Sequence, residues 1–304
     1  MLANLNDLLL LNKNNNVQRL AVVAAHDEYV IEAVTKAICY HIKPILIGRT
    51  EEITKILTSK ALDIHNYQII DATSDEEAAA IGVSLITDNQ ADFLMKGLLD
   101  TKVLLKAVVN HDTGIREKSL LSHVMIASSP YYHKVILATD CAMVISPSVD
   151  EKVELINNAV ELAQTLGYNK PKVGIVSAVE KVNPKIVSTV DAFELVKRFN
   201  EGKISNCLLD GPFAIDNLIS MESVKHKGIV SSVAGDADIL VFPNLEAGNV
   251  FYKTLVFLGK AEVAGIIVGA KCPIILTSRA DSSQAKLFSI ILAAVYQNGK
   301  NSCN

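Results

Sequence analysis

Several residue types that organise small secreted proteins and metal sites are scarce in this sequence of 304 residues. Tryptophan is absent, and the cysteines include no CxxC pair. The five are Cys39, Cys141, Cys207, Cys272 and Cys303. Their scatter argues against a disulfide framework and against a zinc site, and it is typical of proteins from a reducing cytosol. We therefore expect a cytoplasmic protein in which most cysteines are small core residues.

An excess of positive charge is also lacking. The formal net charge is −4, and no block of lysine and arginine with interleaved aromatic residues is present. A polyanion would gain little from such a surface, so nucleic acid is not an expected partner. The first residues, "MLANLNDLLLLNKNNNVQRL", have too short an apolar run and the wrong flanks for a signal peptide or a membrane span, so a membrane is not expected either.

The sequence lacks the common nucleotide and hydrolase motifs. Neither G-x-G-x-x-G nor G-x-x-x-x-G-K-[ST] occurs, which disfavours dehydrogenases and kinases of the common types. No G-x-S-x-G motif is present, which weakens a hydrolase interpretation. The seven histidines form no H-x-x-x-H or H-x-x-E pair, so no metal site is predicted. His26 and Asp27 follow the first predicted strand and are interpreted as a helix cap.

Half of the residues are hydrophobic, and the chain is long enough for two cores. Short β-branched runs alternate with amphipathic stretches, which is the pattern of βα units on mostly parallel sheets. The predicted class is therefore α/β. Strands are expected at 20–25, 43–49, 67–72, 91–97, 172–178, 207–211, 237–243 and 273–276. Helices are expected at 27–41, 149–166, 190–200, 248–258 and 282–295, and others begin near 50, 74 (as a capping box) and 101.

A break in this alternation marks the expected domain boundary. Residues 119–147 contain two β-rich runs around Ser-Ser-Pro, which predicts a hairpin or a crossover between two sheets. We expect a first domain from 1–137 and 272–304, to which the C-terminal helix returns, and a second domain from 138–271.

Candidate site residues follow from the rule that ligands of α/β sheets bind beyond the carboxyl ends of the strands. In "TSRADSSQ", Asp281 is predicted to cap a helix with Gln284 at its third position. The free amides of that helix and Arg279 would together bind an anion, with Ser278 as a further donor. A salt bridge from Arg279 to a nearby carboxylate is the equally weighted alternative.

Three other stretches occupy equivalent positions in the predicted sheets. They are "MKGLLDT", "DGPFAID" and "FPNLEAGNVFYK", in the last of which Gly248 would permit close approach to a ligand. For each, the alternative is a capped helix with a solvated lysine, or an aspartate that serves as a cap. The candidate binding residues in these stretches are Lys96, Thr101, Asp210, Asn249 and Lys253.

Taken together, these stretches resemble the phosphate acyltransferase family, which includes phosphate acetyltransferase and phosphate butyryltransferase. The resemblance rests on "LMKGLLDTKVLLKAVVN", "GIREKSLLSHV", "INNAVELAQTLGYNKPKVGIVSAVEKVNPK", "DGPFAIDNLIS", "ADILVFPNLEAGNVFYKTL" and "PIILTSRADSSQAKLFSI", in the family's order over nearly the whole chain. The butyryltransferase branch is the more similar one.

The resemblance implies two α/β/α domains of the isocitrate and isopropylmalate dehydrogenase type and a homodimer or larger homo-oligomer. It implies reversible transfer of a short acyl group, butyryl or similar, between coenzyme A and inorganic phosphate, with both as substrates and no tightly bound cofactor. Ser278 and Arg279 match the family's reacting centre. The acetyltransferase branch carries an aspartate, proposed as a base, where this chain has Ala285. Asp281 could replace it, or coenzyme A could react as the thiolate without a protein base.

Two alternatives to this function remain at this point. A protein that kept the fold but lost turnover would bind acyl-CoA or phosphate without catalysis, and a phosphate acetyltransferase would differ only in its acyl group.

Overall fold

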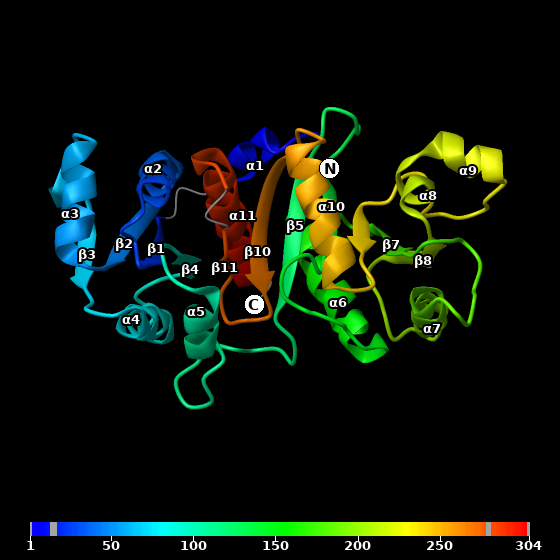
Figure 1. The fold of residues 1–304 in the computed structure, drawn as a ribbon, viewed down its shortest axis with the longest axis horizontal. Coiled ribbons are helices and arrows are strands. Elements are labelled where there is room, and N and C mark those ends of the chain that lie inside the picture. Colours follow the sequence, from blue (N-terminus) through cyan, green and yellow to red (C-terminus); the bar gives the residue numbers. More distant parts are fainter. Residues whose placement is uncertain (1, 13–16, 278–280, 303–304) are drawn as a thin grey trace. The chain divides into compact units, whose positions relative to one another are not determined.

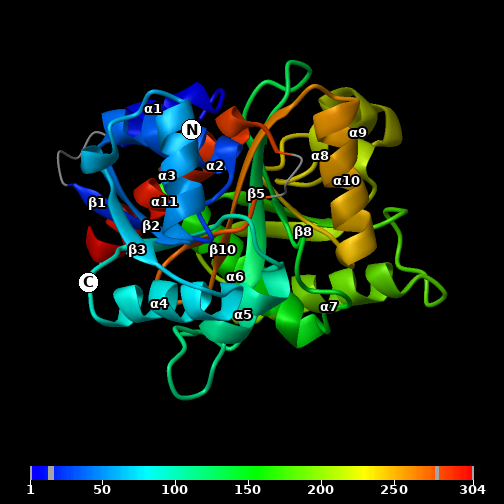
Figure 2. The ribbon, with the colours of Figure 1, turned by 60° about the vertical axis from the view of Figure 1, so that its left-hand side comes forward.

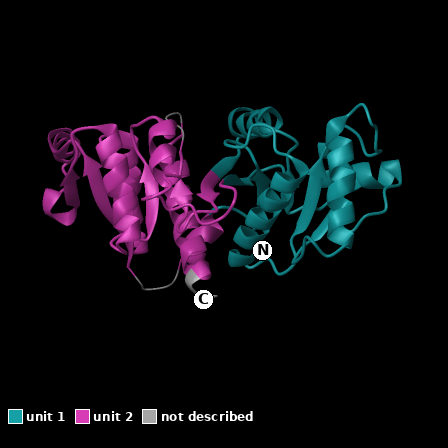
Figure 3. Ribbon diagram, turned by 90° about the horizontal axis from the view of Figure 1, so that it is seen from below, with its two compact units in different colours: residues 1–5, 122–263 teal, residues 6–121, 264–304 magenta. Residues whose placement is uncertain are grey.

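The computed structural model describes residues 2–12, 17–277 and 281–302, and it divides into two compact units (Figures 1 and 3). Unit 1 contains residues 1–5 and 122–263, and unit 2 contains residues 6–121 and 264–304. The predicted domains were 1–137 with 272–304 and 138–271, whereas the chain passes between the units after residues 5, 121 and 263. The predicted hairpin within 119–147 pairs with a strand of unit 1, so the chain leaves unit 2 before the hairpin begins.

Unit 2 is built on a mostly parallel sheet with the strand order β3-β2-β1-β4-β11-β10. Only β10 runs antiparallel to its neighbour β11. Leu20 lies opposite Phe93, and both side chains are fully buried, as expected for a sheet covered on two faces. The strands are β1 (Gln18–Val23), β2 (Ile42–Gly48), β3 (Gln68–Asp71), β4 (Phe93–Lys96), β10 (Glu262–Val268), which contains the boundary at 263, and β11 (Ile274–Ile275).

Helices cover both faces of this sheet. Helix α11 packs against α1 and α2, while α4 packs against α5 and against β1 from the other side (Figure 2). The helices are α1 (Asn6–Leu11), α2 (Glu28–Ala37), α3 (Thr50–Ser59), α4 (Asp75–Thr87), α5 (Thr101–Val108) and α11 (Ser283–Ser302), with 3-10 turns η1 (Ile38–Tyr40) and η2 (Ile64–Asn66). Asp27 caps α2 by accepting a hydrogen bond from the Val30 amide at 2.8 Å, which confirms its predicted role.

The strands of unit 1 follow one another in the order β5-β6-β9-β7-β8. The β5–β6 pair is the predicted hairpin and is antiparallel, and the other pairs are parallel. Helices α6 and α7 pack against each other, and α8 and α9 lie on the opposite face (Figure 2). The elements are β5 (Ser122–Ser128), β6 (Ile136–Thr139), α6 (Val149–Thr165), β7 (Lys172–Val176), α7 (Val187–Asn200), β8 (Leu208–Phe213), α8 (Ile215–Ile219), α9 (Met221–Lys227), β9 (Ile239–Val241) and α10 (Leu245–Phe257).

Two of the helix starts show how the serine caps work. Ser74 caps α4 as predicted, because its hydroxyl accepts from the Glu77 amide. The Glu77 carboxylate accepts from the amide and hydroxyl of Thr73 and not from the Ser74 amide, so the predicted capping box is incomplete. The complete box lies at α6, where Ser148 and Glu151 each accept from the other's amide. Both arrangements satisfy amides that the first helical turn leaves free.

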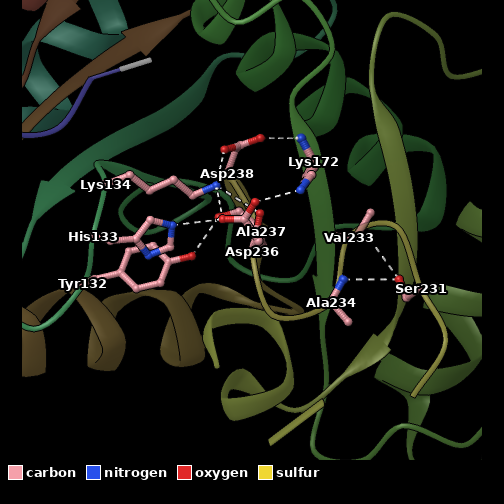
Figure 4. Close-up of polar contacts among 10 residues, drawn as sticks. All are labelled: Tyr132, His133, Lys134, Lys172, Ser231, Val233, Ala234, Asp236, Ala237 and Asp238. Atoms are coloured by element: carbon pink, nitrogen blue, oxygen red, sulfur yellow. Dashed lines mark hydrogen bonds and ion pairs between the residues drawn. The ribbon is translucent and has the colours of Figure 1, made fainter. Parts of the chain in front are cut away.

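A charged network joins the amino ends of β6, β7 and β9 in unit 1 (Figure 4). Lys134 is 2% exposed and forms ion pairs with Asp238 and with Asp236, the latter at 2.9 Å. Lys172 pairs with Asp236 at 2.7 Å, and His133 approaches the same carboxylate at 3.1 Å. Burial opposes ionisation of Asp236, but hydrogen bonds from Lys172 and Lys134 lower its pKa to about 2. The network therefore clamps three strands at the edge opposite their carboxyl ends.

The predicted α/β class with mostly parallel sheets is confirmed. Strand β10 and helices α1, α8 and α9 were not predicted. Cys141, Cys207 and Cys272 are buried, as expected of core cysteines, whereas Cys39 is exposed. Among the described residues, no helix combines the length and the apolar character needed to cross a bilayer.

Candidate active site

The strand order of unit 2 places a topological switch point at the carboxyl ends of β1 and β4. These strands are parallel neighbours. The helix after β1, α2, packs with α11, and the helix after β4, α5, packs with α4 on the opposite face. Chain segments that leave two adjacent strands toward opposite faces leave room between them, and ligands of open α/β sheets bind there. The residues at this point are Ala24–His26 and Lys96–Leu99.

Lys96 is a buried cation at the carboxyl end of β4. It is the last residue of β4 and only 6% exposed, and its ammonium donates to the carbonyl oxygens of Gly97 and Leu99 at 3.2 and 2.9 Å. A side chain at Gly97 would place its Cβ 2.2 Å from the Ala24 carbonyl oxygen, so only glycine fits beside β1. Thr101 begins α5, which Asp100 caps by accepting from Lys102 N. Lys96 therefore places a positive charge at the carboxyl end of β4.

The second predicted segment of the site follows β11, which pairs with β4. Ser278 and Arg279 lie outside the described residues, so their predicted roles stay predictions. Asp281 is half-buried. It was predicted to cap α11, but the capping side chain is Ser282, whose hydroxyl accepts from the Ala285 amide at 3.2 Å. The prediction placed the helix start one residue too early, because aspartate and serine are equally good caps and stand side by side.

Lys286 and Ser283 hold the start of α11. The side chain of Lys286 is 2% exposed, and its ammonium donates to the Asp281 carbonyl oxygen at 2.7 Å. Burial lowers the pKa of Lys286, while the negative charges of Asp281 and Asp27 oppose that shift. Ser283 donates to Glu32 of α2 at 2.9 Å, which holds the start of α11 against the helix that follows β1. Lys96 and Asp281 thus follow neighbouring strands at one edge of unit 2.

The remaining predicted residues lie in unit 1. Asp210 was predicted to follow a strand, but β8 continues to Phe213, so Asp210 lies inside it, with its carboxylate accepting from the Gly211 amide. The strand continues through Pro212 because β8 is an edge strand with a register shift opposite that region. Lys253 is exposed on α10, with its ammonium 5.4 Å from the Tyr252 ring centre.

Helix α10 is fixed by a loop that the sequence analysis did not single out. Gly248 packs so closely that an added Cβ would lie 2.2 Å from the Asp140 carbonyl oxygen, and Asn249 donates to the Cys141 carbonyl oxygen at 3.2 Å. Gly248 therefore permits close approach of the protein's own backbone, where a ligand was predicted.

Asp140, directly after β6, holds this loop. Its side chain is 2% exposed and accepts from the amides of His123, Ala142 and Met143 at 2.8, 2.7 and 2.7 Å. An aspartate immediately after an apolar strand was the available signal in "VILATDCAM". Because its oxygens are taken up by backbone amides, Asp140 positions the loop beneath α10.

No cluster of three or more potential metal-binding side chains occurs among the described residues. The cations that the structure does place, Lys96 and Lys286, suit an anionic substrate.

Comparison with known proteins gives consistent results. Residues 73–294 match the family described as phosphate acetyl/butaryl transferase. The chain is 43% identical over 283 residues to phosphate acetyltransferase of Thermotoga maritima, covering 92% of this chain and 95% of that protein. It is 42% identical over 296 residues to phosphate butyryltransferase of Clostridium beijerinckii, covering 97% and 98%. The crystal structure of a branched-chain phosphotransacylase from Enterococcus faecalis V583 superposes with a TM-score of 0.84 at 34% identity, covering 92% of this chain and 99% of that one.

Proposed function

The chain belongs to the phosphate acetyl- and butyryltransferase family, and on that premise we propose that it catalyses acyl-CoA + phosphate ⇌ acyl phosphate + CoA with butyryl or a similar short acyl group. The observation that carries this proposal is the family match over residues 73–294, supported by relatives of both branches that align over nearly their full length. Coenzyme A and phosphate act as substrates, and no tightly bound cofactor takes part.

In the proposed reaction, an oxygen of phosphate attacks the thioester carbonyl carbon. The new C–O bond forms, the C–S bond breaks, and the electron pair leaves with sulfur as the coenzyme A thiolate. Negative charge develops on the carbonyl oxygen during the attack, so the reaction needs donors and cations near that oxygen more than it needs a protein nucleophile. We assign this role to Arg279 and Ser278.

Five residues are proposed to bind the substrates. Lys96 supports the assignment because a buried ammonium lies at the carboxyl end of β4, the edge at which ligands of such sheets bind. Thr101, Asp210, Asn249 and Lys253 complete the proposed set.

Preference for a butyryl-type group is the finer part of the proposal. Relatives named for acetyl and for butyryl transfer have nearly equal identity to this chain, at 43% and 42%. The acyl groups differ by a few methylenes, and each methylene changes the rate about 10- to 200-fold in an apolar pocket. Ala285 supports the butyryl branch, because the acetyltransferases are expected to carry an aspartate at this position.

We further propose a homodimer or larger homo-oligomer in the cytoplasm, with no nucleic acid or membrane partner. Helix α10 supports the self-association, because Gly248 is its only fully buried residue although most of its side chains are apolar. Val250 and Phe257 are 65% and 66% exposed.

The test is release of coenzyme A from butyryl-CoA with and without phosphate. We expect release that requires phosphate, and higher kcat/KM for butyryl-CoA than for acetyl-CoA in a panel with propionyl and branched thioesters. Binding of butyryl-CoA without phosphate-dependent release would show the non-catalytic binding protein, and a preference for acetyl-CoA would show the acetyltransferase.

A further inference from the structure

Lys286 lies where a charged side chain is costly. Residues 286–296 of α11 are all buried, and Lys286 is the only charged residue among them. It is the fourth residue of the helix, and its amide donates to the Ser282 carbonyl oxygen at 3.1 Å. The amino end of a helix carries partial positive charge, which disfavours a lysine nearby, and burial adds the larger cost of removing water from the ammonium. The side chain therefore needs an explanation beyond packing.

The surroundings of Lys286 offset this cost only in part. Side chains of a helix tilt toward its amino end, and the Lys286 ammonium reaches back to donate to the Asp281 carbonyl oxygen at 2.7 Å. Burial lowers the pKa of Lys286, and the negative charges of Asp281 and Asp27 oppose this shift without cancelling it. The folded protein therefore holds the ammonium less favourably than water does.

A structural role alone does not require this charge. Methionine is unbranched and adaptable, so it would fill the same space, and apolar replacement of buried charged groups is often neutral or stabilising. The helix start is also fixed by Ser282, which caps α11, and by Ser283, which donates to Glu32 at 2.9 Å. What a methionine could not supply at this position is positive charge.

The place of Lys286 in the chain indicates what the charge serves. Lys286 closely follows Ser278 and Arg279, the residues proposed to act at the reacting centre, and it binds the carbonyl oxygen of Asp281 at the end of the same segment. We propose that Lys286 is a positioning residue of the phosphate site, which fixes the Asp281 end of this segment and adds its positive charge to the site. Because Lys286 is 2% exposed, it acts through the segment and not by touching phosphate. This inference rests on the proposed function, which makes phosphate a substrate.

Binding of inorganic phosphate, measured by calorimetry against chloride at equal ionic strength, tests the inference without any turnover. Lys286→Met should weaken phosphate binding about tenfold, because one nearby positive charge is lost. Lys286→Gln keeps a hydrogen-bond donor and removes the charge, so it should weaken binding by a similar factor. Lys300→Met, which removes a lysine from the last turn of the same helix, is the matched control and should change binding less than about twofold.

Kinetics with the two substrates supply the second measurement. Lys286→Met should raise KM for phosphate about tenfold and leave KM for butyryl-CoA unchanged. The value of kcat should stay within about threefold of wild type, because phosphate carries its negative charge both before and during the attack. A residue that only supports the fold would not separate the two Michaelis constants in this way.

Stability supplies the third measurement. Without phosphate, Lys286→Met should unfold at the same or a higher urea concentration than wild type, because a buried charge is removed and Asp27 and Asp281, both half-buried, stay within reach of water. A lower midpoint with equal rises in both KM values, or wild-type phosphate affinity in either Lys286 variant, would overturn the inference. Phosphate binding that depends on Lys286 in a protein without phosphate-dependent release of coenzyme A would instead overturn the proposed function and leave the role of Lys286 in anion binding standing.

Discussion

At the scale of single residues, Arg279 is the first test of the chemistry. A guanidinium gives two parallel hydrogen bonds to phosphate or to an acyl phosphate, and an ammonium cannot. We expect Arg279→Lys to lower kcat about 100-fold or more, the usual loss when a donor to a developing oxyanion is removed. The thermal unfolding midpoint of Arg279→Lys should match that of the wild type, because the substitution keeps the positive charge and changes only the hydrogen-bonding geometry of the side chain. Turnover within twofold of wild type would remove Arg279 from the reacting centre.

A second question at this scale is whether a protein base removes the proton of the coenzyme A thiol. Asp281 is the candidate base, and a variant at this position tests it. With Ser282 as the cap of α11, the side chain of Asp281 is not required for that role. We expect the rate from acyl phosphate to acyl-CoA to climb toward the thiol pKa of about 8.5, because the thiolate is the nucleophile in that direction. Asp281→Asn should leave this pH profile unchanged. Loss of a limb of the profile in a stably folded variant would identify Asp281 as the base.

The residue scale also shows where sequence interpretation stops. Lys96 at the end of β4 was singled out from its position at the end of an apolar strand. The choice between Asp281 and Ser282 as cap was not predictable, because their intrinsic preferences are equal. The partners of buried Lys134 lie about a hundred residues later in the chain, and no local pattern connects such positions.

At the scale of elements, Gly248 sets how closely α10 approaches the loop after β6. An alanine Cβ would meet the Asp140 carbonyl oxygen at 2.2 Å, so Gly248→Ala must move the helix or the loop. We expect a loss of about 1–3 kcal/mol in the free energy of unfolding, measured with urea. Thr254→Ala, at an exposed position of the same helix, should change it by less than about 0.5 kcal/mol. An unchanged midpoint for Gly248→Ala would show that α10 is not held by this contact.

The charged network at the amino ends of β6, β7 and β9 predicts that the free energy of unfolding depends on pH. The pKa of Asp236, about 2, lies below the unfolded value near 4, so its contribution is present above pH 4 and is lost as the pH falls toward 2. Allowing for partial exposure, we expect it to be about 1–2 kcal/mol. The gap in unfolding free energy between wild type and Asp236→Asn should shrink by about two thirds of this amount from pH 6 to pH 2.5, because the native carboxylate is still partly ionised at pH 2.5.

Element types were largely predictable, because β-branched runs and amphipathic stretches alternate so regularly. Strand β10 was missed because Glu262 and Gly265 interrupt its apolar run, and α8 and α9 because five and seven residues are too few for a helical period to show. The extension of β8 through Pro212 contradicts the usual meaning of proline in a strand, which only the edge position explains.

At the scale of the whole molecule, self-association should depend on the exposed apolar residues of α10. We expect wild type to sediment as a dimer or larger species, and Phe257→Glu to sediment as a monomer with an unchanged circular dichroism spectrum, because a carboxylate there would be buried without a partner. Tyr131→Glu, at a position 79% exposed between β5 and β6, is the matched control and should keep the wild-type assembly. A monomeric wild type, or an unchanged Phe257→Glu assembly, would contradict this role for α10.

The discontinuity of unit 2 has a consequence for how the chain is made on the ribosome. The last strand residue of unit 1, Val263, is synthesised before β11 and α11, while β4 and α2 of unit 2 need those two elements as neighbours. The strands of unit 1 can therefore pair while the chain is still being synthesised. The part of unit 2 that is made first cannot finish folding until β11 and α11 are made, and until then the free edge of β4 can pair with other chains. Nascent-chain force measurements should show unit 1 folding before release. A circular permutant that joins the two termini and opens the chain between residues 121 and 122 would bring the two parts of unit 2 together, apart from residues 1–5, and would remove that wait.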